Sequence, residues 1–144
     1  MARVNDIVNK CKSLSASQLG KLGEDCYWDL AYYLNGRIGR EKATAAIIDT
    51  LLVCTVLDGY FSRGEWEVMQ NVFHISDCNY EYYCEQFDDV RRQEVQLKLD
   101  VKGFCRILPA KERISFVTLC IAMMCADGHF TYEDLDFLED CLLD

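Results

Sequence analysis

The residues of this chain that are best suited to binding a ligand lie in two copies of one acidic motif. The first copy is Asp58-Gly59-Tyr60-Phe61-Ser62-Arg63-Gly64-Glu65, and the second is Asp127-Gly128-His129-Phe130-Thr131-Tyr132-Glu133-Asp134. In each copy an apolar run ends at Asp-Gly, and an acid stands seven residues after the Asp. Carboxylate oxygens brought together in this way can ligate a divalent cation such as calcium, magnesium, manganese or zinc. The candidate metal ligands are therefore Asp58, Glu65, Asp127, Asp134 and Glu133.

The same motif also has a purely local explanation. In each copy the glycine suits the left-handed turn that ends a helix, and the hydroxyl residue and the acid three residues later have the spacing of a capping box. The Asp before the glycine can accept a hydrogen bond from a backbone N–H of its own turn. Two explanations stay open: acidic turns that hold a cation, and turns that only cap helices.

Helices on both sides must position the two turns. Residues 43–57 and 114–126 are apolar and nearly uncharged, which predicts two buried helices. Each capping box then opens a further helix, so the chain contains two helix–acidic turn–helix units, at about residues 41–74 and 109–143. We expect the two apolar helices to lie together at the centre of the fold. Whether the two turns meet stays open.

The rest of the chain predicts more helices. A capping box at Ser15 and Gln18 opens a helix that we expect to run from about Ala16 to Leu34, with an aromatic packing stripe of Tyr27, Trp28, Tyr32 and Tyr33. Residues 94–102 alternate apolar and polar side chains as a strand does, but a lone strand has nothing to pair with, so we expect helix or irregular structure. The predicted fold class is all-α, a bundle of about seven helices. A single domain spans residues 1–144, and residues 1–40 form an N-terminal helical extension.

Composition and charge limit the classes of ligand and the cellular location that we expect for this protein. The chain has 51% hydrophobic residues and a formal net charge of −9, which argues against nucleic acid as the main ligand. Arg63 is the only Lys or Arg between residues 43 and 89, whereas Lys and Arg outnumber acids between Arg91 and Arg113. The longest strongly apolar run is too short to span a bilayer, and the N-terminus does not read as a signal peptide. We therefore predict a cytoplasmic protein without direct membrane insertion.

Nine cysteines and two histidines complete the reactive side chains. Cys54, Cys120, Cys125 and Cys141 fall in apolar helical runs and no pair has the C-x-x-C spacing, so packing is the main interpretation, with a redox or metalloid role as the alternative. His129 lies in the second turn, where a ligand or base is conceivable, but Tyr60 fills the equivalent place in the first copy. No nucleophile–base or phosphate-loop pattern is present, so we predict no enzymatic activity.

The turns match the second half of an EF-hand loop but lack its first half, because apolar helix stands where calcium loops place their earlier ligands. Residues 43–73, with Asp58-Gly59-x-Phe61-x-x-x-Glu65, and residues 116–142, with Ala126-Asp127-Gly128-x-Phe130, resemble the two halves of the tellurite-resistance TerB family. The resemblance covers roughly residues 41–143. It implies a cytoplasmic helical bundle whose turn acids hold a divalent cation. It also implies a stress or metal-response role, often beside membrane proteins of the TerC type, and no catalysis.

Residue by residue, Asp58, Glu65 and Asp127 match the family acids, while Asp134 stands where a Glu is usual and has Glu133 beside it. The expected function is a non-enzymatic TerB-like module that binds a divalent cation, a partner protein or both through the two turns, in a stress, metal-response or defence system. The alternative is an acidic protein-interaction domain with purely structural turns and no metal.

Overall fold

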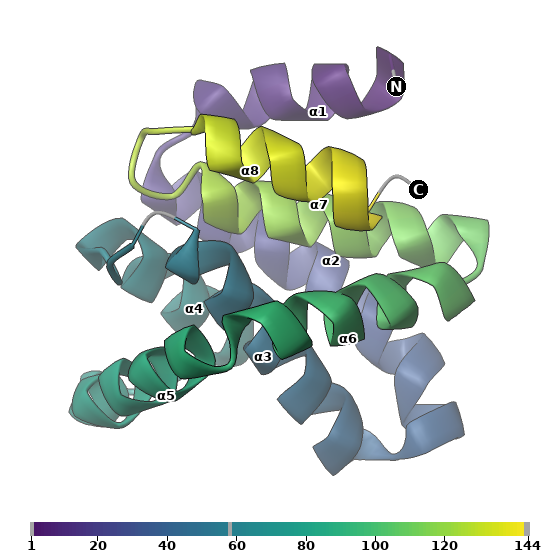
Figure 1. The fold of residues 1–144 in the computed structure, drawn as a ribbon, viewed down its shortest axis with the longest axis horizontal. Helices are drawn as coiled ribbons and strands as arrows, with labels where there is room; N and C mark the ends of the chain where they lie inside the picture. Colours follow the sequence, from purple (N-terminus) through teal and green to yellow (C-terminus); the bar gives the residue numbers. More distant parts are fainter. Residues whose placement is uncertain (1, 58, 143–144) are drawn as a thin grey trace.

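The computed structural model describes residues 2–57 and 59–142, with side chains for residues 4–57 and 59–140. Over these residues the chain is a bundle of eight α-helices without a strand (Figure 1). The helices are α1 Ala2–Lys12, α2 Ala16–Ile38, α3 Arg40–Val56, α4 Arg63–Phe73, α5 Tyr80–Arg92, α6 Glu94–Ile107, α7 Ala110–Met124 and α8 Tyr132–Phe137; a 3₁₀ turn, η1 Asp77–Asn79, precedes α5 and a π-helical turn, η2 Leu138–Leu142, follows α8. The all-α prediction is confirmed, with eight α-helices in place of about seven. Within the described part of the chain, no helix is both long enough and apolar enough to cross a membrane.

The two apolar helices α3 and α7 form the centre of the bundle. Residues 50–56 and 119–126 are buried without interruption. A helix that is apolar on every side needs neighbours on every side. Helices α2, α5 and α6 pack around α3, helices α1, α2 and α4 pack around α7, and α3 and α7 contact each other. The predicted central position of these two helices is confirmed.

Helix α2 makes residues 1–40 part of the core. It packs against α4 and α7, and it buries Leu19, Leu30 and Leu34. The helix does not end near Leu34 as predicted; it continues to Ile38 and ends at Gly39, whose φ is 88°. Polar Asn35 and small Gly36 are both exposed, so they are tolerated within the last helical turn.

The aromatic stripe of α2 is only partly a packing face. Tyr27 and Tyr33 are half-buried, and the Tyr27 ring lies edge-on to Phe73 of α4, with 5.0 Å between centroids. Trp28 and Tyr32 are 55% and 90% exposed, so the prediction was wrong for them. The physical reason is the angular width of the stripe: four aromatic residues spread around more of the helix than α4 and α7 cover.

Helix α6 explains the alternating pattern of residues 94–102. Val101 and Cys105 are buried against the bundle, whereas Val95 and Leu99 are exposed. The apolar residues therefore serve two opposite faces of one helix, so of the two expected alternatives, helix or irregular structure, the segment is helix. In Figure 1, α6 and α8 lie on the near side of the molecule, and α6 also packs against η2.

Candidate functional site

The first turn is built as the local explanation predicts. Gly59 has a φ of 86°, the left-handed conformation in which a residue without Cβ is unstrained. The Ser62 hydroxyl accepts a hydrogen bond from the Glu65 backbone N–H at 3.1 Å, and the Ser62 backbone N–H donates to Glu65 Oε1 at 2.7 Å. The Glu65 side chain is fully buried. Asp58, the first predicted ligand, lies outside the described residues.

The second turn repeats this construction. Gly128 has a φ of 84°, and Thr131 and Asp134 form the equivalent capping box, with the Thr131 N–H donating to Asp134 Oδ2 at 2.8 Å. Asp134 is fully buried, like its counterpart Glu65. Asp127 Oδ1 accepts a hydrogen bond from the His129 N–H at 3.1 Å, which is the backbone partner that an Asp in such a turn was expected to find.

The two turns meet. The Tyr60 hydroxyl donates to Asp127 Oδ2 at 3.4 Å, which joins the first turn to the second. Gly64, at the start of α4, packs directly on the backbone that ends α7: a Cβ built on Gly64 would lie 2.1 Å from the Ala126 carbonyl oxygen. The question that the sequence left open is answered by this contact, and the glycine at position 64 is what permits it.

The buried capping acids face the thiol pair between the central helices. A hydrogen bond with Cys120, complete burial, and the negative charges of Asp134 and Glu65 together raise the pKa of the Cys54 thiol well above its usual range. Both carboxylates therefore act on the same point of the core, although they come from different turns. The thiol stays protonated at neutral pH, so it packs as a small apolar side chain there.

The predicted metal ligands separate into two groups. Glu65 and Asp134 are buried inside the bundle, Asp127 is half-buried in its turn, and Glu133 is exposed. Among the residues that the structure describes, no three His, Cys, Asp or Glu side chains form a group that could hold a metal ion. The described His, Cys, Asp and Glu side chains therefore do not form a three-ligand group by themselves, and Asp58 lies outside the described residues.

Neither histidine lies among the buried acids. His129 is exposed in the second turn, as expected for a solvent-facing turn residue. His74 ends α4 with a φ of 54°, and its Nε2 donates to the Glu24 carboxylate of α2. That hydrogen bond is the main reason why the pKa of Glu24 lies below its usual range. His74 thus links the end of α4 to α2.

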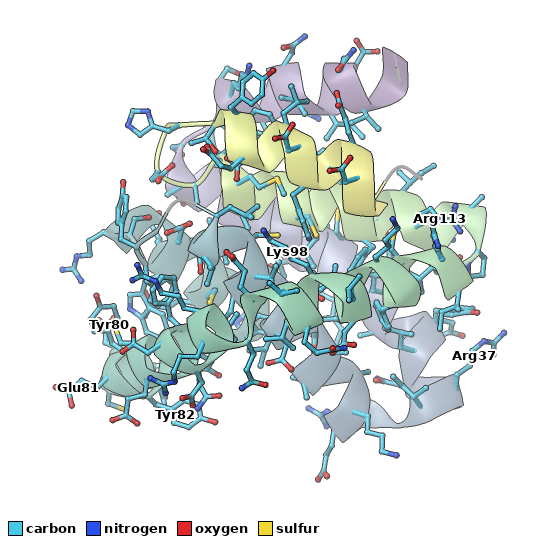
Figure 2. All side chains as sticks on the ribbon, viewed as in Figure 1. Arg37, Tyr80, Glu81, Tyr82, Lys98 and Arg113 are labelled. Atoms are coloured by element: carbon cyan, nitrogen blue, oxygen red, sulfur yellow. The ribbon has the colours of Figure 1, made fainter. Side chains whose placement is uncertain are left out.

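Four acids lie together in a groove beside the turns. We call it the acidic groove: it has a volume of about 400 Å³ and is lined by Leu57, Glu94, Lys98, Glu133, Asp136, Phe137 and Asp140. Leu57, which is half-buried, supplies the apolar surface, because Phe137 is only 3% exposed, and four of the other five residues are acids. Lys98 Nζ lies 3.8 Å from Glu94 Oε2, and Figure 2 shows Lys98 pointing from α6 toward α8. The groove therefore offers net negative charge around apolar contacts.

Sequence reasoning missed this groove apart from Glu133. The missed acids are Glu94, Asp136 and Asp140. A signal was present in part, because residues 133, 136 and 140 are spaced three and four apart and must lie along one side of α8 and η2. Nothing local indicated that α6 would supply the opposite wall, since that depends on how distant segments pack.

Comparison with known proteins adds no relative: no family model, no curated protein and no solved structure matches this chain. The resemblance to the TerB family therefore stays a prediction that rests on the two turns.

Proposed function

We propose that this protein is a non-enzymatic docking module whose acidic groove binds a cationic, amphipathic helical segment of a partner protein. One observation carries the proposal. Glu65 and Asp134 of the repeated motif are buried and cap helices, whereas Glu133 lies with Glu94, Asp136 and Asp140 in a groove that also contains Leu57.

The chemistry of the groove defines the occupant. An aliphatic side chain of the partner would contact Leu57, which supplies affinity through apolar burial. Lys or Arg side chains on the same segment would pair with Glu133, Asp136 and Asp140, which supplies orientation and discrimination against acidic segments. A helix with cations three and four residues apart presents both features on one side.

The biological setting is an extension of the same proposal. The resemblance to the TerB family places the module in a stress, metal-response or defence system, with membrane proteins of the TerC type among the candidate partners. The groove specifies only the chemistry of the partner segment.

The test uses two labelled peptides and three forms of the protein. The first peptide repeats Leu and Lys at helical spacing, and the second carries Glu in place of every Lys. We expect fluorescence anisotropy to give a dissociation constant on the order of 10–100 µM for the Lys peptide and no binding of the Glu peptide. The variant Glu133→Lys/Asp136→Lys should lose at least tenfold in affinity, while Glu81→Lys/Glu85→Lys on α5 makes the same charge change away from the groove and should lose much less.

An equal loss of affinity for the Lys peptide in the two double variants would contradict the proposal, because binding would then depend on net charge and not on the groove. Retention of full affinity in Glu133→Lys/Asp136→Lys would contradict it as directly. Circular dichroism on each variant separates these outcomes from misfolding.

A divalent cation bound at the turns is the second candidate function. The observation in its favour is the contact between Tyr60 and Asp127, which brings the two acidic turns together so that acids of both could serve one site. Calorimetric titration of metal-stripped protein with calcium, magnesium, manganese and zinc tests it. Heat of binding that disappears in Asp58→Ala/Asp127→Ala would support a cation site; no heat in either protein, with a lower melting temperature of the variant, would make these acids structural.

A further inference from the structure

The outer face of α6 carries an apolar ridge that no described part of the chain covers. Val95, Leu99 and Ile107 are 76%, 60% and 74% exposed. Together with Gly103 they are spaced four residues apart, so they form one line along the helix. We call residues 95, 99, 103 and 107 the α6 ridge. Exposed aliphatic residues scattered singly are common, but an ordered line of them on one helix is typical of a contact surface.

Gly103 has no role inside the fold that would require a glycine. A Cβ built there would meet nothing within 4 Å. Glycine in the middle of a helix is unfavourable relative to alanine, because it loses more backbone freedom on folding. Its absent side chain leaves a notch in the ridge between Leu99 and Ile107, and such notches let a second helix approach closely.

Cationic side chains flank the ridge. Lys102 and Arg106 each lie three residues after a ridge position and border it. The acid Asp100, which lies three residues before Gly103, also borders it and accepts a hydrogen bond from Gln96. Arg92 lies at the end of α5, before α6 begins. Arg92 pairs with Asp89 one turn earlier in α5. Lys102 and Arg106 form no salt bridge within the described chain, so their charges are available to a partner. The ridge thus has the composition that the acidic groove requires of its occupant.

The ridge and the acidic groove lie side by side along α6, because the groove residues Glu94 and Lys98 each directly precede a ridge residue. The helices α6 and α8 both run across the near side in Figure 1. The groove lies between them, since it is lined by Glu94 and Lys98 of α6 and by Glu133, Asp136 and Phe137 of α8. This face therefore presents a cationic apolar strip beside an anionic apolar strip.

We infer that the α6 ridge of one copy docks into the acidic groove of a second copy, which forms a two-fold dimer of this chain. The inference rests on the proposed function of the groove and names its occupant. A two-fold axis lying in this face, between the two strips, places each strip of one copy over the opposite strip of the other. One face thereby makes two identical contacts, as an isologous interface requires.

Charge selects this pairing among the alternatives. Two α6 ridges facing each other would oppose two strips of net positive charge, since Lys102 and Arg106 outnumber Asp100, and two grooves facing each other would oppose acids. The crossed arrangement pairs opposite net charges at both contacts. The full charge of −9 on each copy opposes association at long range, but at physiological salt it is screened beyond about 8 Å, whereas the paired side chains lie in contact.

Sedimentation equilibrium of the full chain tests the dimer. We expect wild-type protein to change from monomer to dimer between about 5 and 500 µM, as befits a small and reversible interface. Lys102→Glu/Arg106→Glu and Glu133→Lys/Asp136→Lys should each remain monomeric at concentrations at least tenfold higher. Leu99→Ser should weaken dimerisation several-fold, whereas Ile38→Ser, which removes a 40%-exposed aliphatic side chain from the end of α2, should leave it unchanged.

Sedimentation equilibrium of a mixture of the two charge-reversed variants is the decisive experiment. In the mixture the acidic α6 of one variant faces the basic groove of the other, and the basic α6 of the second faces the acidic groove of the first. We expect a heterodimer at wild-type concentrations, although neither variant dimerises alone. A loss of stability in either variant cannot produce this recovery.

The possible outcomes separate this inference from the proposed function. A wild-type chain that stays monomeric throughout overturns the dimer, and the groove still stands as a docking site if it binds the Lys peptide. A dimer that survives both charge reversals overturns the assigned interface. Failure of the mixture to associate would show that the crossed pairing is wrong, even if each variant is monomeric.

Discussion

Gly64 and Glu133 occupy equivalent positions in the two copies of the repeated unit, yet their surroundings are opposite. Gly64 is pressed against the carbonyl oxygen of Ala126, and Glu133 is exposed at the acidic groove. The internal symmetry of the sequence is therefore broken at this position. The first copy uses it to join the turns, and the second copy uses it to place a charge at the surface.

Replacement of Gly64 by alanine should destabilise the fold through this contact. A Cβ at 2.1 Å from the Ala126 oxygen forces backbone to move, and overpacking of this kind costs about 1–3 kcal/mol. Gly36→Ala is the matched control, since a Cβ there meets nothing within 4 Å and alanine should stabilise the helix by roughly 0.5–1 kcal/mol. Urea unfolding of both variants measures the difference. Similar stability for the two variants would mean that the turns do not meet as described.

The cysteines should divide sharply in reactivity. Cys11, Cys26, Cys54, Cys105, Cys120 and Cys125 are buried, and burial as the main cause raises the pKa of Cys26 and Cys125 to about 12. Cys78 is exposed. In a Cys141→Ser background, a thiol reagent followed by peptide mapping should modify Cys78 first and reach the buried set only after unfolding. Fast modification of Cys54 or Cys120 would contradict the packing role and favour a redox one.

At this scale the sequence predicts the local roles well. Both capping boxes, both left-handed glycines and the backbone partner of Asp127 follow from residue types a few positions apart. It does not predict that Glu65 and Asp134 would be fully buried beside Cys54, because that burial depends on α3 and α7 packing across the molecule. Local hydrogen bonds are encoded locally, whereas solvent exposure is not.

At the scale of the elements, α3 carries a charge that its position disfavours. Asp49 is exposed, yet neighbouring atoms displace part of the water around its carboxyl, and this desolvation raises the pKa of that carboxyl above the ordinary value of 3.8. The folded protein then binds the proton more tightly than the unfolded chain. The resulting contribution to stability is complete below pH 3.8 and is lost as the pH rises through the folded-state pKa.

Asp49→Asn should therefore raise the melting temperature at pH 7, because the amide needs no ionic hydration. The advantage over wild type should shrink as the pH falls and vanish once the carboxyl is protonated in both states. Thermal unfolding across this range measures it, with Glu81→Gln on exposed α5 as the control. An advantage that is constant with pH would point to helix propensity and not to the charge.

Helix identity was more predictable than helix surroundings. Residues 94–102 are helical although they alternate like a strand, because the apolar residues of α6 serve the core on one face and the α6 ridge on the other. The close packing of α2 on α4 was not anticipated. It depends on Gly20 and Gly23, whose missing side chains leave room for Asn71 and Val72 of α4. Two glycines three residues apart look the same in the sequence whether they face another helix or solvent, so the sequence does not predict this contact.

At the scale of the whole molecule, the two units do not form a free-standing bundle. Helix α2 lies against both α4 of the first unit and α7 of the second, and so joins them. Helix α1 covers α7 more lightly, through Val8 and Cys11, and borders an open groove of about 430 Å³ beside α8. The sequence suggested an extension for residues 1–40 because that segment lies outside the repeats. Its packing shows that these two helices contribute unequally to the core.

Two truncations test this inequality. Removal of residues 1–14 should leave a folded protein that unfolds cooperatively but is destabilised by about 2–4 kcal/mol, the value of exposing one or two buried side chains. Removal of residues 1–38 should abolish cooperative unfolding, because the apolar surfaces of α4 and α7 that α2 buries would face water together. Thermal unfolding followed by near-ultraviolet circular dichroism distinguishes the two. If residues 39–144 alone unfold cooperatively near the wild-type melting temperature, the duplicated units are the complete fold and α2 is an accessory to it.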